Sequence, residues 1–212
     1  MKIKGLLLSA AVALTMAPPA VAERASDGNV SIIYWQAPSI LNPYLSGGTK
    51  DIESSSLVIE PLGRYDQTGA LVAYLAEDIP TVANGGVSAD LTSITWTLKK
   101  GLKWSDGSPV TSADVKFTAD YCMNPDMGCA QLAAFDGIES IKVVDDLTVT
   151  VNFDAPKPNP YGPFMGGQSP IIQKAQFENC VGAAAPGLSL IHISEPTRQA
   201  EISYAGVGVK KK

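Results

Sequence analysis

Side chains able to carry out acid–base or nucleophilic chemistry are scarce in the central part of this sequence. The only histidine is His192, close to the C-terminal end, so residues 23–187 contain none. This excludes a Ser-His-Asp or Cys-His catalytic unit there, and it removes the commonest neutral metal ligand. The acidic residues include no pair at a recognisable catalytic spacing. We therefore expect no catalytic residues, no metal ligands and no cofactor.

The charge balance argues against another class of function. The chain has 16 basic and 21 acidic residues, and residues 23–187 keep 10 basic against 19 acidic residues, a net charge of −9. Such a surface repels phosphate backbones and anionic lipid head groups. Nucleic acid is therefore not an expected partner. The hydrophobic content of 45% is ordinary for a globular protein.

Cysteines offer a third kind of chemistry. Cys122 and Cys129 lie on either side of Asn-Pro-Asp at 124–126, which favours a turn. We predict a local disulfide between the two cysteines. A metal-binding pair is the alternative, although it lacks a histidine or a second cysteine pair. Cys180 is left over, and this odd count suggests a partner outside the sequence.

The N-terminal segment has the order of a secretory signal peptide. Residues 1–4, with Lys2 and Lys4, form a basic start before the apolar run 5–16. Residues 20–22 form an A-x-A site, so we expect cleavage between Ala22 and Glu23. The run is too short to span a bilayer core of about 30 Å. The alternative is a buried or membrane-anchoring helix. No cysteine lies near the cleavage point, so no lipid anchor is indicated.

The C-terminal segment 188–212 looks foreign to the rest. Residues 188–198 read LSLIHISEPTR, which resembles one reading frame of a transposase-type sequencing adapter, and the closing lysines resemble poly-A read-through. Residues 206–209 depart from the usual adapter translation. A strand followed by a basic tail is the alternative. We expect the natural protein to continue past Gly187, with 23–187 as its folded part.

The pattern of residues 23–187 predicts a mixed α/β (α+β) fold without a regular βαβ repeat. Alternating and β-branched residues predict strands at 29–35 and 94–98 and hairpins at 62–72 and 138–153. Capping residues and helix-ending prolines predict helices at 51–59, 111–121 and 170–177, with a short helix or turn at 74–79. In the helix at 111, Asp114 takes the place of the usual Glu or Gln of a capping box.

Residues 96–117 read WTLKKGLKWSDGSPVTSADVKF. This segment resembles the signature of the family 5 extracellular solute-binding proteins, the oligopeptide-, dipeptide- and nickel-type receptors of bacterial ABC importers. The matching residues are Trp96, Leu98, Lys99, Gly101, Trp104, Asp106, Gly107, Pro109, Val110, Asp114, Val115 and Phe117. The alanine of the pattern falls one place late, at Ala113. The signature types suggest a structural role, because tryptophans supply core area and Asp106-Gly107 suits a tight turn.

The resemblance implies a type II periplasmic-binding-protein fold, of which this chain would hold an incomplete N-terminal lobe with its extra subdomain. It implies a periplasmic, non-enzymatic, monomeric receptor that captures peptides or a similar solute and delivers it to ABC permease subunits in the inner membrane. A family member that binds nickel chelates, opines or sugar derivatives remains an alternative. A secreted hydrolase using paired carboxylates is a second alternative, from outside the family.

The loop at 39–46 and the start of the next helix resemble the part of such a receptor that faces the solute. Our candidates for solute contacts are Tyr34, Trp35, Asn42, Tyr44, Thr49 and Ser54. A purely structural role in the loop is an equal alternative, especially for Asn42, which suits a turn before Pro43. Backbone groups are expected to contribute more to binding an extended peptide than any one side chain.

Overall fold

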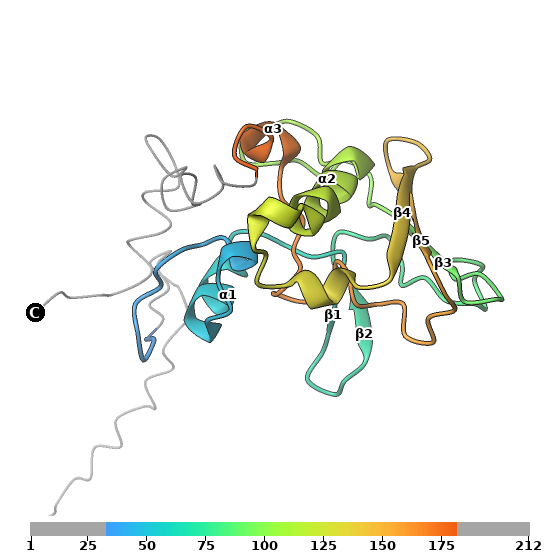
Figure 1. Ribbon diagram of the computed structural model, residues 1–212, viewed down its shortest axis with the longest axis horizontal. Coiled ribbons are helices and arrows are strands. Elements are labelled where there is room, and N and C mark those ends of the chain that lie inside the picture. Colours follow the sequence, from blue (N-terminus) through green and yellow to red (C-terminus); the bar gives the residue numbers. More distant parts are fainter. Residues whose placement is uncertain (1–32, 182–212) are drawn as a thin grey trace, which may run out of the picture.

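The computed structural model describes residues 33–181 of the chain. Its helices and strands are η1 (Pro43–Leu45), α1 (Thr49–Ser55), β1 (Gly63–Tyr65), β2 (Leu71–Ala73), β3 (Ser93–Thr97), α2 (Ser112–Met123), η2 (Pro125–Met127), η3 (Leu132–Phe135), β4 (Ile138–Val143), β5 (Thr148–Phe153) and α3 (Lys174–Phe177), where η marks a 3-10 helix. Figure 1 shows the sheet of β3, β4 and β5 at one end of the molecule and α1 at the other, with α2 between them.

The larger sheet is antiparallel, with the strand order β3-β5-β4. Alternation along β5 buries Val149, Val151 and Phe153, while the residues between them stay half-buried. Trp96 of β3 pairs with Val149 and is itself fully buried. One face of this sheet therefore belongs to the core, as the alternation of the sequence predicts.

Helix α2 packs against β4 and β5 of the sheet and also against η3 and α3. The backbone N–H of Thr111 donates to the Asp114 carboxylate (2.9 Å), which gives the helix the N-terminal bond expected from a capping box. Val115, Thr118, Ala119 and Cys122 are buried at helical spacing. The predicted helix at 111–121 is thus confirmed, one residue later at its start and two residues longer at its end.

Both predicted hairpins are present, one formed by β1 and β2 and the other by β4 and β5. The helix expected at 51–59 begins earlier, at Thr49, and ends at Ser55, from where turns lead to Pro61. Residues 74–79 form no helix, because Ala76 makes an isolated antiparallel bridge with Leu98 instead. Of the strand expected at 29–35, residues 33–35 are not in a strand, and 29–32 lie outside the described residues.

The helix predicted to begin at Pro170 is wrong in its first half, since α3 begins only at Lys174. Residues 171 and 172 instead bond to distant segments of the chain, and Gln173 is extended. The N–H of Ile171 donates to the Glu60 carbonyl (2.9 Å), and the N–H of Ile172 donates to the Thr118 hydroxyl (3.0 Å). Ser169 does not cap a helix, because its hydroxyl accepts the N–H of Phe164 (2.8 Å).

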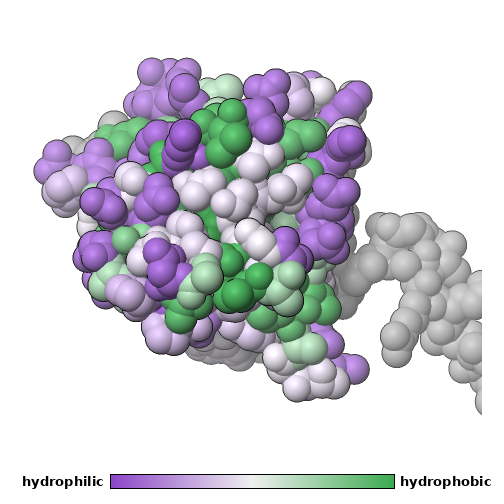
Figure 2. Space-filling model, turned by 90° about the vertical axis from the view of Figure 1, so that its right-hand side faces the viewer, coloured by the Kyte–Doolittle hydropathy of each residue, from purple (hydrophilic) through white to green (hydrophobic). Residues whose placement is uncertain are grey.

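The surface on the side of the sheet is mixed in character. Figure 2 shows hydrophobic residues in small groups between hydrophilic ones on this side of the molecule. Apolar side chains scattered in this way are ordinary on protein surfaces and do not by themselves mark an interface. Among residues 33–181, the structure contains no helix with the length and apolar character needed to cross a membrane.

Candidate functional site

The loop that contains the predicted solute contacts is built around a three-residue 3-10 helix, η1. Asn42 precedes it in an extended conformation, and its side-chain oxygen accepts the N–H of Tyr44 (3.0 Å). Pro43 occupies the first position of the helix, where a missing N–H costs nothing. The Asn-Pro pair therefore sets the turn, and the Asn42 amide then reaches the hydroxyl of Tyr121 in α2 (3.2 Å).

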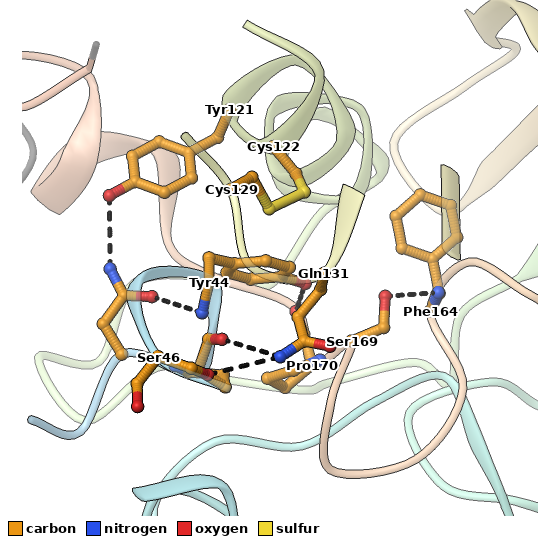
Figure 3. Close-up of a disulfide and its surroundings, with 11 residues drawn as sticks. Tyr44, Ser46, Tyr121, Cys122, Cys129, Gln131, Phe164, Ser169 and Pro170 are labelled. Carbon is orange, nitrogen blue, oxygen red and sulfur yellow. Dashed lines mark hydrogen bonds between the residues drawn. A yellow bond between two sulfur atoms is a disulfide. The ribbon is translucent and has the colours of Figure 1, made fainter. Parts of the chain in front are cut away.

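Tyr44 anchors this loop in the core. Its side chain is fully buried, its ring packs edge-on to Tyr121, and its hydroxyl donates to the Pro170 carbonyl (2.5 Å). Figure 3 shows the ring between α2 and the segment that carries Ser169 and Pro170. Burial raises the pKa of the Tyr44 hydroxyl far above its ordinary value, so the group stays protonated and remains a donor.

Asp51 gathers the two ends of the loop around one carboxylate. It accepts the backbone N–H groups of residues 39 and 40, the hydroxyls of Ser39 and Ser46, and the ammonium group of Lys50 at 2.9 Å. Burial alone would raise the pKa of Asp51. The bonds from Lys50, Ser46, Ser39 and Ile40 outweigh burial and lower this pKa to about 2, so the carboxylate is charged at neutral pH.

The six predicted contacts divide into two groups. Asn42, Tyr44 and Ser54 are buried, and the first two use their polar atoms for bonds within the protein. Trp35, with 75% of its surface exposed, and Thr49 are exposed, and Tyr34 is half-buried. The structure thus leaves Tyr34, Trp35 and Thr49 open to a solute, and solute contact by any of the six stays a prediction.

Sequence reasoning missed the residues that hold this loop from a distance. Gln131 is buried, and its amide donates to the carbonyls of Pro43 (3.2 Å) and Ser46 (3.3 Å). The sequence marks Asp51 only as the first residue of the helix expected at 51–59. No local pattern marks either residue for this role, because Gln131 lies 85 residues from Ser46 in the chain.

A separate groove of about 230 Å³ lies between the end of α1, the signature turn and α3. Polar and apolar groups line it in similar measure, and Glu60, Lys103 and Gln176 are among the polar ones. None of the six predicted contacts lines it. The volume is below the roughly 300–1,000 Å³ of ordinary small-molecule pockets. This groove is therefore not the site that the sequence led us to expect.

The signature residues form a structural unit centred on Asp114. One carboxylate oxygen of Asp114 accepts from the backbone of Thr111 and the indole of Trp104 (3.3 Å), and the other accepts the N–H of Lys174 (2.9 Å). The carboxylate thus joins the signature turn, α2 and α3. This supports the structural role expected for the signature.

The turn within the signature is fixed in the same way. Gly101 and Gly107 adopt φ values of +77° and +87°, which favour glycine. The Asp106 carboxylate accepts bonds from Ser108 and from the side chain of Gln173, and these bonds lower its pKa below the ordinary value. The signature turn is thus held by bonds within the protein, and a structural role for the signature stays a prediction.

Cys122 and Cys129 are joined in a disulfide, and Cys180 is a free cysteine. The bridge connects the last turn of α2 to the segment that carries Gln131, next to the buried Tyr44 (Figure 3). Within residues 33–181 no three side chains of the His, Cys, Asp and Glu types come together as a metal site. What the arrangement offers is a hydrogen-bonded loop beside which Tyr34, Trp35 and Thr49 are accessible.

Comparison with known proteins gives this surface a context. A Brucella ovis protein, provisionally named an ABC transporter peptide-binding protein, is 34% identical over 101 residues, which are 47% of this chain and 18% of that protein. The glutathione-binding protein GsiB of Pectobacterium atrosepticum is 28% identical over 116 residues, 55% of this chain and 21% of GsiB. The chain therefore spans about a fifth of the length of these relatives.

Solved structures show the same fold. The oligopeptide-binding protein AppA of Bacillus subtilis, solved in complex with a nonapeptide, matches with a TM-score of 0.65 at 20% identity, over 76% of this chain and 31% of AppA. The described residues thus have the fold of part of a type II periplasmic binding protein.

The profile described as "bacterial extracellular solute-binding proteins, family 5 Middle" matches residues 70–193. The match includes the whole signature and extends six residues into the segment 188–212. It covers more than half of the 212 residues. The chain belongs to the family 5 bacterial extracellular solute-binding proteins.

Proposed function

We propose that this chain belongs to the solute-capturing component of a bacterial ABC importer and that its solute is a peptide. The observation that carries the proposal is the family match over residues 70–193, together with relatives whose names describe peptide and glutathione binding. Glutathione is itself a tripeptide. In this proposal the protein is exported through the segment 1–22, works in the periplasm as a monomer and delivers its solute to permease subunits.

The described surface supports binding rather than catalysis. Tyr34, Trp35 and Thr49 are accessible, and they adjoin a loop that the core holds rigidly through Tyr44 and Asp51. A preformed surface loses less conformational entropy when a solute binds. Residues 23–187 contain no histidine to act as a general base. We infer that the protein is not an enzyme and that it uses no cofactor.

The test is a titration of the protein expressed from the uninterrupted genomic reading frame, whatever its length. We expect isothermal titration to detect heat with a pool of di- to pentapeptides and none with a nickel–histidine chelate. Heat with the chelate alone would move the assignment to the metal-chelate receptors of the family. No heat with either probe would contradict solute capture of both kinds.

The proposed contacts can be tested in the same protein. Trp35→Ala should weaken peptide binding by about tenfold, as truncation of an aromatic binding residue commonly does. Tyr65→Ala is the matched control, because Tyr65 is also an exposed aromatic residue, 53% accessible, but lies on the β1–β2 hairpin. Equal affinities for the two variants would remove Trp35 from the solute site.

A further inference from the structure

The segment that follows the disulfide makes three bonds to the candidate site. The N–H of Ala130 donates to the Tyr44 carbonyl (2.9 Å), and the Gln131 amide donates to the carbonyls of Pro43 and Ser46. All three acceptors belong to η1 or its C-cap residue. Figure 3 shows both Gln131 bonds directed at the loop below the disulfide.

A three-residue 3-10 helix cannot satisfy its own carbonyl groups. At η1 the Asn42 carbonyl accepts the N–H of Leu45. The carbonyls of Pro43, Tyr44 and Ser46 need donors from elsewhere. A glutamine amide carries two hydrogens, so one side chain can bridge both ends of the helix at once. Gln131 thus replaces the bonds that a longer helix would make itself.

The disulfide fixes the position from which Gln131 acts. Cys122 is buried in the last turn of α2, and Cys129 directly precedes Ala130 and Gln131. Residues 124–128 between the two cysteines form η2 and its flanking turn. The cross-link ties the start of the Gln131 segment to α2, the helix whose Tyr121 already bonds to Asn42.

Hydrogen bonds of Ser46 and Asp51 extend this restraint toward the part of the chain that precedes the loop, where the candidates Tyr34 and Trp35 lie. Ser46 accepts from Gln131 through its carbonyl and donates through its hydroxyl to Asp51 (2.7 Å). Asp51 in turn holds the backbone of residues 39 and 40, a few residues after Trp35. A set of hydrogen bonds therefore leads from Gln131, two residues after Cys129, to residues 39 and 40, which follow Trp35 in the chain.

We propose that Gln131 is a positioning residue for the solute site: held by the Cys122–Cys129 bridge, it fixes the loop at 42–46 and through it the solute-facing segment. The inference rests on the proposed function only where it assigns residues 34–54 to the part of the protein that faces the solute. The fixing of the loop is a property of the chain itself, so it can be measured without any solute.

The experiment is amide hydrogen exchange on the 212-residue chain, comparing Gln131→Met with Gln173→Met. Methionine keeps the length of the side chain and removes the donor. Gln173 is also a buried glutamine whose amide makes two bonds, but to Asp106 and Ser108 in the signature turn. Exchange at Val149 and Val151 of β5 reports the stability of the whole core.

We expect Gln131→Met to speed exchange of the Tyr44, Leu45 and Ala130 amides by about tenfold while β5 stays unchanged. Gln173→Met should leave these three amides unaffected. The Cys122→Ala/Cys129→Ala double variant should loosen the same amides.

Unchanged exchange at 44, 45 and 130 in Gln131→Met would overturn the proposal. An equal rise in the loop and in β5 would also overturn it, because Gln131 would then act on global stability. Because no solute is present, these outcomes do not depend on the proposed function. A failed peptide titration of the genomic protein would contradict that function separately.

Discussion

The side-chain amide of Asn42 donates to the hydroxyl of Tyr121 across 3.2 Å, although the two residues are 79 positions apart in the chain. Both side chains are fully buried. Asn42 also accepts the N–H of Tyr44, so one side chain caps η1 and ties it to α2. The position of the candidate site on the lobe therefore depends on a buried polar pair.

Replacing this asparagine should destabilise the fold more than the loss of a cap alone. Asn42→Ala removes the cap, worth about 1 kcal/mol, and leaves the buried Tyr121 hydroxyl without its donor, which costs about 1–3 kcal/mol more. We expect the free energy of unfolding in urea to fall by about 2–4 kcal/mol.

Asn124→Ala provides the control for this prediction. Asn124 likewise caps a 3-10 helix that begins with proline, and it accepts the N–H of Asp126 (2.9 Å), but it is only half-buried. Its replacement should cost no more than about 1 kcal/mol. Equal losses for the two variants would show that the bond to Tyr121 contributes nothing.

The sequence predicted the parts of the fold that depend on local patterns. Alternation identified the strand 94–98 and the hairpin 138–153, and the Thr111–Asp114 spacing identified the start of α2. In place of the helix expected from Pro170, residues 171 and 172 follow an irregular path and bond through their amides to Glu60 and Thr118. Those partners lie far away in the sequence, where no periodicity or capping signal can indicate them.

Asp114 should contribute more to stability than its position in a capping box suggests. Asp114→Ala removes the carboxylate that accepts hydrogen bonds from Thr111, from the Trp104 indole and from the Lys174 backbone. Because the residue is buried, we expect a loss of about 2–4 kcal/mol in urea unfolding, and faster hydrogen exchange at the Lys174 amide.

An aspartate on the same helix gives the comparison. Asp120 is exposed, and among the residues that the structure describes it pairs with Lys116, one turn earlier. Asp120→Ala should change the free energy of unfolding by less than about 0.5 kcal/mol. A loss as small as this for Asp114→Ala would contradict a joining role for the signature carboxylate.

Asp51 should make the stability of the chain depend on pH in the acid range. Its pKa is lowered in the folded state to about 2 from the ordinary 3.8, so its contribution is complete above about pH 4 and is lost as the pH falls toward 2. The difference corresponds to about 2 kcal/mol. Urea unfolding between pH 6 and pH 2 should show this loss in the wild type.

The Asp51→Asn variant should lack this part of the pH dependence. Asp66→Asn serves as a control, since hydrogen bonds from Thr68 and Ala70 also lower the pKa of Asp66, but this carboxylate is exposed and screened by water. Its replacement should alter the pH profile less. An Asp51→Asn profile that matches the wild type throughout would contradict a carboxylate-centred loop.

The candidate site was less predictable than the fold. Asn42, Tyr44 and Ser54 were possible contacts because the loop at 39–46 and the start of the next helix resemble the solute-facing part of a family 5 receptor. In the structure the same side chains are buried, since Asn42 and Tyr44 bond to Tyr121 and Pro170 in the core. Burial of a loop residue depends on the segments packed over it, and those come from 79 and 126 residues away.

The two signature tryptophans should differ in their response to substitution. Trp96 is fully buried, and within the described residues its indole N–H has no hydrogen-bond partner, whereas the half-buried Trp104 donates to Asp114. Trp96→Ala should cost about 3–5 kcal/mol through the cavity it leaves. Trp96→Phe should cost much less, because it keeps an aromatic ring and removes no hydrogen bond. Urea unfolding of Trp96→Phe and Trp96→Ala, with Trp104→Phe beside them, measures the difference. If Trp96→Phe proved as damaging as Trp96→Ala, the indole N–H would have to be bonded after all, and the packing of β3 against β5 would need another explanation.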